Sequence, residues 1–536
     1  MAAPNPAVQA SAISPQGGIQ VGESGEFIVN GPTVPSLQEL SMGKMLQQQV
    51  DRRPEKLAVV SRWQKTSLTY QSLFDTSRDI AQALLMHGVR PTDRVIVLAG
   101  NSIEYVQLLF AVAGIGSVFT IINPTFTAEE VVSTVDFIDP KAIFMAERIG
   151  YRNNKNLLKE LAAKQQRTSL IVQLGTSEKV SSNVLSWDEF RQIEPNGTQP
   201  GLHSVDQYWV EENPHAPLCI QFTSAHGGTT IIPSDVFNAD SSLRACSEDG
   251  CTVIHAVPTM FQAMLDHSKT QALPLRLRLR TGIIAGASLS EILIQRLCDE
   301  FGLRGLAYAF GMTELSCVSF MTNPAKVCLL DDRSSVGTPL PHTSVKVVDS
   351  DLKTVPPGTR GELLVSGYLV FSEYYKNPQK TEEAIVKDAQ GRRWLRTGDL
   401  VTLSDSGACV IVGRVKDMIK KGGENIAPAD IEKVLEQHPD IAAAAVIGIP
   451  DTRWGETIGA YIQRGQNAQS ELNAKDIKIW LRNRIAPHKI PDHVFWIGEE
   501  AGVPQELPVN ATGKVLKTEL SAIARDLLKG RSVLVA

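Results

Sequence analysis

The residues of this sequence that could do chemistry lie mostly in its C-terminal half. Common catalytic signatures are missing, because the chain contains no GxSxG, HExxH or GxxxxGK[ST] segment. Its ten histidines do not cluster at metal-ligand spacing, and no CxxC pair occurs. Four polar, glycine-containing segments remain as candidates: residues 309–314 (AFGMTE), 396–399 (RTGD), 413–423 (GRVKDMIKKGG) and 510–514 (NATGK). Their acids can accept hydrogen bonds or hold a cation, and their lysines and arginines can neutralise an anion.

Each of these residues also has an ordinary structural interpretation. Glu314 taken alone is a solvated turn carboxylate, and Asp399 can close an Asx turn after a Thr-Gly pair. Phe310 can be a core aromatic, and Arg414 can form a surface salt bridge. A single lysine such as Lys514 is usually solvated, although the glycine before it allows its loop to fold tightly over a ligand.

Taken together and in this order, the four segments resemble the adenylate-forming (AMP-binding) superfamily. This superfamily includes acyl-CoA synthetases, 4-coumarate–CoA ligases, luciferases and peptide-synthetase adenylation domains. The phrases at 257–261 (VPTMF), 361–363 (GEL) and 426–432 (IAPADIE) are also similar to it, and the resemblance runs from about residue 36 to 520. Residues 29–35 (VNGPTVP) look like fungal members of the medium-chain acyl-CoA synthetase branch.

The resemblance implies an acid–CoA ligase that uses ATP, Mg²⁺ and coenzyme A, in a fungal secondary-metabolite or siderophore pathway. A carboxylic acid is adenylated with release of pyrophosphate, and the thiol of coenzyme A then attacks the acyl-adenylate. Because two anions must be brought together, the growing charge has to be neutralised. A stand-alone adenylation enzyme that charges a separate carrier protein is an alternative.

The resemblance also assigns roles to residues of the first candidate segment and its neighbourhood. The hydroxyl of Thr313 lies on the phosphate, Glu314 binds Mg²⁺, and Phe310 lies against the adenine. Gly286 and Ala287 correspond to the backbone that lines the adenine, although tight packing after a strand explains these small residues almost as well. Thr313 and Glu314 are therefore expected to be catalytic.

Further roles fall on the later segments. Asp399 accepts hydrogen bonds from both ribose hydroxyls, as a carboxylate can from a vicinal diol, and Arg414 completes the ribose contacts. Lys514 bridges the substrate carboxylate and the α-phosphate. Lys416 matches the hinge about which the small domain swings, exchanging Lys514 for the Gly422-Gly423 turn that approaches the thiol donor. A plain hairpin turn explains Gly422-Gly423 equally well.

The sequence departs from the family at the phosphate loop, which reads roughly T-S-G-T-T-G-x-P-K-G. Thr223 and Ser224 fit the start of that loop and are assigned to nucleotide binding, but residues 225–233 (AHGGTTIIP) match a segment that the family places several tens of residues later. The glycines and lysine of the loop, a helix and an aromatic segment near the acyl pocket are expected to be absent. A divergent phosphate loop at 224–230 is the alternative.

Loss of the phosphate loop removes several charge-assisted hydrogen bonds of about 1.5–3 kcal/mol each, enough to abolish activity. A catalytically inactive relative that binds a nucleotide or an acyl ligand is therefore a second hypothesis.

Around these segments the sequence alternates between helical and strand patterns. Residues 94–99 and 142–145 read as buried strands between helices, which predicts parallel sheets covered by helices. Short strands after about residue 340 predict a small β-barrel-like part, and a mixed α+β pattern follows residue 414. We therefore predict an α/β fold with a large N-terminal domain and a small mobile C-terminal domain. The expected units are a disordered tail (1–35), the N-terminal domain (36–413), a hinge (414–416), a lid domain (417–525) and a second tail (526–536).

Composition narrows the partners and the compartment. The 536 residues carry 53 Lys and Arg against 58 Asp and Glu, a net charge of −5 that does not indicate nucleic acid or an anionic membrane as a partner. Residues 105–122 are apolar enough for a membrane span, but Gln107 and two glycines predict a buried helix followed by a strand. Without a basic residue before Lys44 or a C-terminal S-K-L, we expect a cytoplasmic protein with reduced thiols. About twenty residues follow Lys517, too few for a carrier domain, so the expected partners are a small carboxylic acid and coenzyme A.

Overall fold

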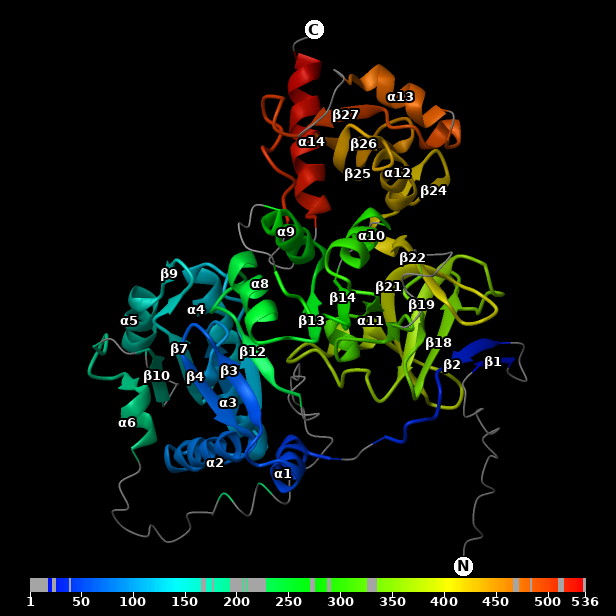
Figure 1. Cartoon of the computed structure of the whole chain (residues 1–536). Helices are drawn as coiled ribbons and strands as arrows, with labels where there is room; N and C mark the ends of the chain where they lie inside the picture. The colour runs from blue at the N-terminus through cyan, green and yellow to red at the C-terminus, as the bar shows by residue number, and fades with distance from the viewer. Residues whose placement is uncertain are drawn as a thin grey trace, which may run out of the picture.

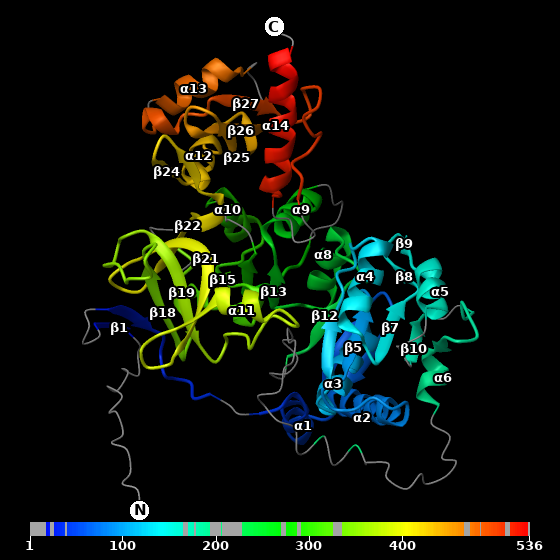
Figure 2. The same cartoon turned by 180° about the vertical axis from the view of Figure 1, so that it is seen from behind.

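The structure is a computed structural model. It describes residues 18–21, 26–37, 40–164, 170–175, 178–192, 205, 209, 228–269, 275–286, 291–324, 335–465, 472–482, 484–509 and 515–533. Figures 1 and 2 show three regions in the large domain and a smaller lid domain above them.

The first region is a parallel sheet with helices on both faces, as the alternating pattern predicted. Its strand order is β11-β10-β7-β5-β6, and all its pairs are parallel. In β5, Val95 and Val97 pack with α2 and α3, whereas Ile96 and Leu98 pack with α4 and α5. The elements are α1 (Met42–Arg52), α2 (Tyr70–Met86), β5 (Arg94–Leu98), α3 (Ile103–Gly114), β6 (Val118–Ile121), α4 (Ala128–Ile138), β7 (Ala142–Ala146), β8 (Arg148–Ile149), β9 (Arg152–Asn153), α5 (Lys155–Ala163), β10 (Leu170–Leu174), β11 (Leu185–Ser186) and α6 (Trp187–Arg191).

The apolar stretch at 105–122 is the buried helix and strand that its letters predicted, since α3 ends at Gly114 and β6 follows. Among the described residues, no helix combines the length and hydropathy that a bilayer crossing requires. The expectation of reduced thiols holds for Cys246, Cys251, Cys317 and Cys409, but Cys298 is disulfide-bonded.

The second region contains two smaller sheets. Strands β12, β3 and β4 form one of them, and the order of the other is β13-β14-β15-β16-β17. The first three strands of the larger sheet are parallel and pack on α8, α9 and α10. The elements are β3 (Leu57–Ser61), β4 (Thr66–Thr69), β12 (Thr230–Ile232), α8 (Ala239–Glu248), β13 (Val253–Ala256), α9 (Pro258–Ser268), β14 (Thr281–Ala285), α10 (Glu291–Glu300), β15 (Gly305–Phe310), η2 (Thr313–Leu315), β16 (Phe320–Met321) and β17 (Thr338–Pro339).

The third region is an antiparallel sheet rather than a barrel. Its order is β1-β2-β18-β19-β21-β20, with β22 paired to β21, so the sheet stays open instead of closing as the expected barrel-like part. Strands β1 and β2 lie within residues 1–35, which corrects the expectation that this whole segment is a disordered tail. The pairing of Val29 with Val345 recruits β2 into the sheet. The elements are β1 (Gly18–Val21), β2 (Phe27–Asn30), β18 (Thr343–Val348), β19 (Gly361–Gly367), α11 (Pro378–Ala384), β20 (Ile385–Lys387), β21 (Arg393–Leu403) and β22 (Cys409–Arg414).

The lid domain begins after β22 and has its own apolar core. Its sheet runs β24-β23-β26-β25, with β27 parallel to β26, and α12 and α13 pack on one face while α14 packs on the other. In Figures 1 and 2 the N-terminal end of α14 points down toward α9. The elements are η4 (Val415–Asp417), β23 (Ile419–Lys421), β24 (Glu424–Ile426), α12 (Pro428–Leu435), β25 (Ile441–Asp451), β26 (Gly455–Arg464), α13 (Ala474–Arg482), η5 (Pro487–Lys489), β27 (His493–Trp496) and α14 (Lys517–Val533).

Candidate functional site

The carboxyl ends of β13, β14 and β15 form one edge of their sheet. The registers Ala256–Ile284 and Ala285–Ala309 bring the three ends level, and this edge is where ligands bind in open α/β sheets. Gly286 follows β14 with a φ of +93°, and a Cβ there would lie 3.3 Å from Val257, so glycine suits both the conformation and the space. Gly286 and the end of β15 are therefore neighbours along one edge.

A tight turn after β15 presents the predicted Thr-Glu pair. A Cβ on Gly311 would lie 1.9 Å from the carbonyl oxygen of Cys317, so only glycine fits the close approach of the two chain segments. The turn leaves Thr313 exposed at the start of η2 and Glu314 half-buried. Phe310 is half-buried beside Phe320, with ring centroids 6.2 Å apart, which is compatible with both a core contact and one open ring face.

Glu314 has a neutral partner rather than a cation. The phenol of Tyr374 donates a hydrogen bond to Oε1 of Glu314 at 2.7 Å. Burial, followed by this bond, raises the pKa of Tyr374 to about 12, so the phenol keeps its proton at neutral pH. Among the described residues no lysine, arginine or histidine forms an ion pair with Glu314.

The carboxylate oxygens of Glu314 suit a magnesium ion whose other ligands are phosphate oxygens of a nucleotide. The described residues contain no cluster of three or more His, Cys, Asp and Glu side chains that could enclose a metal ion. Magnesium is commonly held by one or two carboxylates together with phosphate oxygens, so a single half-buried glutamate without a cationic partner is sufficient.

Asp399 is a buried residue of the strand β21. It lies opposite Arg414 in the β21–β22 ladder and is 4% exposed. Nε of Arg414 lies 2.7 Å from Oδ1 of Asp399, and Nη2 lies 3.4 Å from Oδ2. The backbone N–H of Asp399 donates to Oγ1 of Thr397, which in turn donates to the carbonyl of Leu363. The carboxylate is thus fixed in a defined position.

One thiol connects the Asp399–Arg414 pair to β15. Burial raises the pKa of Cys409, and the nearby charge of Asp399 raises it further. Burial also raises the pKa of Tyr308 to about 12, with a smaller contribution from Cys409. Cys409, Tyr308 and Phe310 belong to one apolar cluster, so the sheet that carries Asp399 and Arg414 packs against β15.

The predicted hinge and thiol-approach residues lie in sequence order beyond this pair. Lys416 is exposed in η4, directly after the strand that carries Arg414. Gly422 and Gly423, with φ of +60° and +89°, form the two-residue turn of the β23–β24 hairpin, as in type I′ turns. Gly422 donates its N–H to the carbonyl of Trp454, and a Cβ on Gly422 would lie 2.9 Å from the Trp454 ring.

Four predicted site residues lie outside the described residues: Thr223, Ser224, Ala287 and Lys514. Val509 and Val515, on either side of the segment that contains Lys514, pair as a β-bridge. The helix that follows, α14, is anchored by an ion pair of 2.6 Å between Lys517 and Glu432.

An ion pair joins the lid domain to the large domain. Arg360, just before β19, lies 3.2 Å from the carboxylate of Asp430 in α12, and Lys489 reaches the same carboxylate at 2.9 Å. Burial opposes ionisation of Asp430, but hydrogen bonds from Lys489 and Arg360 outweigh it and lower its pKa. Sequence reasoning missed the contacts of Tyr374 with Glu314, of Trp454 with Gly422 and of Asp430 with Arg360, because the partners are distant in sequence. The aromatic pair at 374–375 before Asn377-Pro378 was the one local signal.

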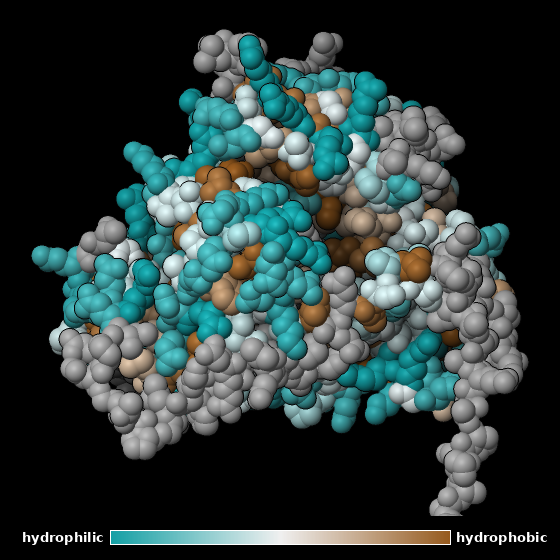
Figure 3. Space-filling model, turned by 60° about the horizontal axis from the view of Figure 1, so that its bottom comes forward, coloured by the Kyte–Doolittle hydropathy of each residue, from teal (hydrophilic) through white to brown (hydrophobic). Residues whose placement is uncertain are grey.

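The edge strand β13 of the sheet beside the candidate site is partly exposed. Parallel strands are usually buried on both faces, yet in β13, an edge strand, Val253 is 40% exposed and His255 is also exposed. Figure 3 shows apolar residues gathered in a hollow of the surface seen obliquely from below.

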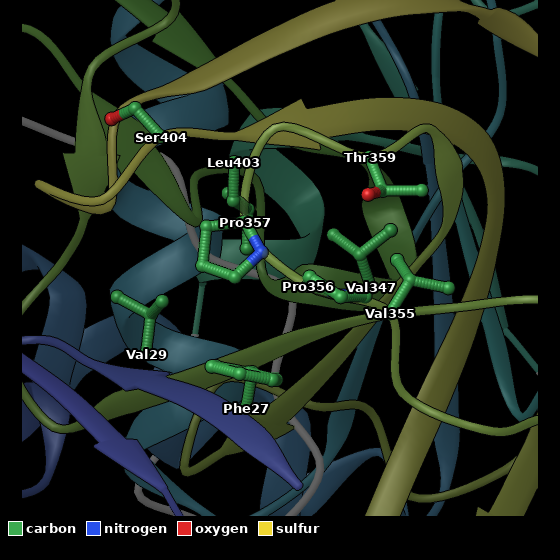
Figure 4. Close-up of a pocket in the computed structure, with 9 residues that line it drawn as sticks. All are labelled: Phe27, Val29, Val347, Val355, Pro356, Pro357, Thr359, Leu403 and Ser404. Carbon is green, nitrogen blue, oxygen red and sulfur yellow. The ribbon is translucent and has the colours of Figure 1, made fainter.

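A separate apolar pocket is too small to bind a substrate. It lies between β2 and the Pro356-Pro357 turn, and Figure 4 shows its side chains converging from β2, β18 and the end of β21. Its volume is about 10 Å³, which is roughly the space that one water molecule needs. The candidate site is therefore the strand-end edge with Asp399 and Arg414.

Comparisons with known proteins match most of the chain. The model of the AMP-binding enzyme family matches residues 46–230 and 224–375, and that of the AMP-binding enzyme C-terminal domain matches residues 430–514. Acyl-CoA ligase sidI of Beauveria bassiana is 32% identical, with 94% of this chain and 95% of the relative covered. Acyl-CoA ligase cnsG of Penicillium expansum is 31% identical, with 94% and 97% covered.

Solved structures of other proteins also share the fold of this chain. The crystal structure of anthranilate CoA ligase AuaEII in complex with anthranoyl-AMP has a TM-score of 0.74 at 21% identity and covers 92% of this chain and 98% of its own. The alignment with sidI spans 563 positions, more than the 536 residues of this chain, whereas the alignment with cnsG spans 505. Because both family models match in order, the chain belongs to the family of AMP-binding enzymes.

Proposed function

We propose that this protein is an acid–CoA ligase that activates a small carboxylic acid as its acyl-adenylate and transfers it to coenzyme A. The acid attacks the α-phosphorus of ATP, so that a carboxylate–phosphorus bond forms and pyrophosphate leaves. The thiolate of coenzyme A then attacks the acyl carbon, so that a thioester forms and AMP leaves. The similarity to fungal acyl-CoA ligases such as sidI and cnsG supports a substrate from secondary metabolism.

The observation that carries this proposal is the position of Asp399. Asp399 is buried and its carboxylate pairs with Arg414, its backbone N–H donates to Oγ1 of Thr397, and its sheet packs against the strand whose end carries Phe310. A buried carboxylate with two acceptor oxygens suits the 2′- and 3′-hydroxyls of a ribose. Arg414 pairs with that carboxylate and can add donors to the sugar. The adenine then lies toward the backbone at Gly286 and the ring of Phe310.

The phosphate end of the site is formed by the turn after β15. The exposed hydroxyl of Thr313 can donate to a phosphate oxygen, and Glu314 would hold the magnesium ion. When bound, this ion supplies positive charge that neutralises the phosphates. Lys514 would add the last cation at the α-phosphate.

Thioester formation requires the lid domain to rotate about Lys416. Rotation removes Lys514 and brings the Gly422-Gly423 hairpin to the site, where the absence of side chains leaves room for the pantetheine arm. Free coenzyme A is favoured over a carrier protein, because the two named relatives are acyl-CoA ligases that match 94% of this chain.

Acid-dependent exchange of pyrophosphate into ATP tests the proposal. The wild type is expected to catalyse the exchange, and Lys514→Ala is expected to abolish it because no other cation replaces the charge at the α-phosphate. Lys433→Ala is the control, since this lysine is exposed on α12 away from the hinge. Exchange that persists in Lys514→Ala contradicts the role of Lys514. Trapping the product with coenzyme A or with a carrier protein identifies the acceptor.

A second candidate function is binding of a nucleotide or acyl ligand without catalysis. It is favoured by the absence of a glycine- and lysine-rich loop after Ser224, by the two overlapping pieces of the family match, and by the extra positions in the alignment with sidI. The shorter alignment with cnsG supports a form of the family that lacks this segment. An absence of exchange together with measurable AMP binding selects this candidate. The transcript around codons 220–230 tests whether a longer loop is encoded.

A further inference from the structure

The contact of Glu314 with Tyr374 is local in space but spans sixty residues of sequence. The phenol donates to Oε1 of Glu314 at 2.7 Å, and the N–H of Phe371 donates to the backbone carbonyl of Glu314 at 2.9 Å. One segment therefore holds both the side chain and the backbone of this glutamate. We infer that Tyr374 is a positioning residue that fixes the carboxylate of Glu314 for the cation that accompanies the nucleotide, an inference that rests on the proposed function.

The surroundings of Tyr374 lock its ring in one orientation. Its ring meets that of Phe371 edge-on at 4.8 Å, and Nζ of Lys380 lies 4.7 Å from its centroid. Its backbone N–H donates to Oγ1 of Thr381 at 2.9 Å, and Thr381 in turn donates to the carbonyl of Asn377. A ring fixed from several sides directs its hydroxyl to one place, which is what a group that orients a metal ligand must do.

The chemistry of the partner favours metal binding over a purely structural contact. A lysine or arginine at this place would neutralise Glu314 and compete with a cation, whereas a phenol orients the carboxylate and leaves its negative charge available. The bond engages Oε1, and within the described part of the chain no second donor reaches the side chain of Glu314. Hydrogen-bond partners of metal-bound carboxylates typically contribute 10- to 100-fold to metal affinity.

The neighbouring tyrosine provides a matched control. Tyr375 turns the other way, where its hydroxyl reaches the carbonyl of Ile138 at 3.4 Å and its ring meets Phe137 at 5.9 Å. Tyr374→Phe and Tyr375→Phe therefore remove the same atom from adjacent residues, and only the first removes a bond to Glu314.

Direct metal binding tests this inference independently of turnover. Mn²⁺, which prefers the same oxygen ligands as Mg²⁺, is titrated into the full-length protein saturated with α,β-methylene-ATP, and free Mn²⁺ is measured by electron paramagnetic resonance. Tyr374→Phe is expected to raise the Mn²⁺ dissociation constant about 10- to 100-fold. Tyr375→Phe should match the wild type, and both variants should bind the nucleotide normally in EDTA and keep the wild-type melting temperature.

The possible outcomes distinguish a failure of the proposed function from a failure of the positioning role of Tyr374. If the wild type binds no Mn²⁺ with the nucleotide, the proposed function fails and the inference fails with it. If the wild type binds Mn²⁺ and Tyr374→Phe binds it equally well, the positioning role is wrong and the function stands. A fall of nucleotide affinity in EDTA, or of melting temperature, in Tyr374→Phe identifies a structural contact and also overturns the inference. In a Glu314→Gln background, Tyr374→Phe should produce no further change in Mn²⁺ affinity.

Discussion

Asp399 is the residue whose surroundings best suit its proposed contact with the ribose of a nucleotide. We expect Asp399→Ala to weaken AMP binding about 10- to 150-fold, because hydrogen bonds to a charged group contribute about 1.5–3 kcal/mol. Calorimetric titration with AMP and with 2′,3′-dideoxy-AMP measures the effect. The wild type should discriminate between the two ligands, and Asp399→Ala should not.

The control for this measurement is Asp405→Ala, which changes an exposed turn carboxylate at the far end of β21. Its affinity for AMP should remain that of the wild type. An Asp399→Ala protein that still prefers AMP over the dideoxy compound would place the ribose elsewhere.

Single residues of the site could be predicted from sequence where a motif carries them. Phe310, Glu314, Asp399 and Arg414 were all predicted from short local segments, and the structure brings Asp399 and Arg414 into contact. Tyr374 could not be found in this way, because its hydroxyl acts on a residue in another segment and no local pattern reports that pairing.

At the scale of elements, an ion pair between Arg360, just before β19, and Asp430 in α12 joins the lid domain to the large domain. Arg360 is largely exposed, and exposed ion pairs are worth about 0–1 kcal/mol, so Arg360→Ala should leave the melting temperature nearly unchanged. The pair nevertheless joins two domains. We expect the lid domain of the variant to separate from the large domain more often. Trypsin should then cleave at Lys416, the proposed hinge residue, up to about 5-fold faster at low salt.

The dependence of the cleavage rate on salt and pH tests the Arg360–Asp430 ion pair further. The difference between Arg360→Ala and the wild type should vanish at high salt, and Lys353→Ala, an exposed lysine near the same end of β19, should cleave like the wild type. Because the pKa of Asp430 is lowered in the folded protein, the contact is complete above the ordinary Asp pKa and is lost only as pH falls through the folded value. Equal cleavage rates at low salt, or a change between pH 6 and 8, would argue against this ion pair as the lid contact.

Elements were predictable where local physics determines them. The capping box of Thr127 with Glu130 begins α4, and α3 ends at Gly114. The open third sheet and the strand β2 were not predictable, because strand partners far apart in sequence decide whether a sheet closes and whether a short segment such as 27–30 joins it.

At the scale of the whole molecule, two histidines link stability to pH. Partial desolvation lowers the pKa of His87, whose ring stacks on that of Phe190 at 5.4 Å, and it also lowers the pKa of His255 in β13. The folded state therefore disfavours the protonated imidazole, and the unfolded state takes up protons first. Stability is full above the ordinary histidine pKa of about 6.5 and falls as pH drops from there toward the folded values.

Because the folded state lowers the pKa of these histidines, the urea midpoint should be lower at pH 5.5 than at pH 7.5. The difference between the two midpoints should be smaller in His87→Phe. Phenylalanine keeps the stacking on Phe190 and cannot acquire a charge, so the variant should lose less stability on acidification than the wild type does. His488→Phe, at an exposed position in η5, should follow the wild-type pH dependence. If His87→Phe keeps the full pH dependence, acidification destabilises the protein through other groups. The urea midpoints of this variant at pH 5.5 and pH 7.5, compared with those of the wild type, decide this.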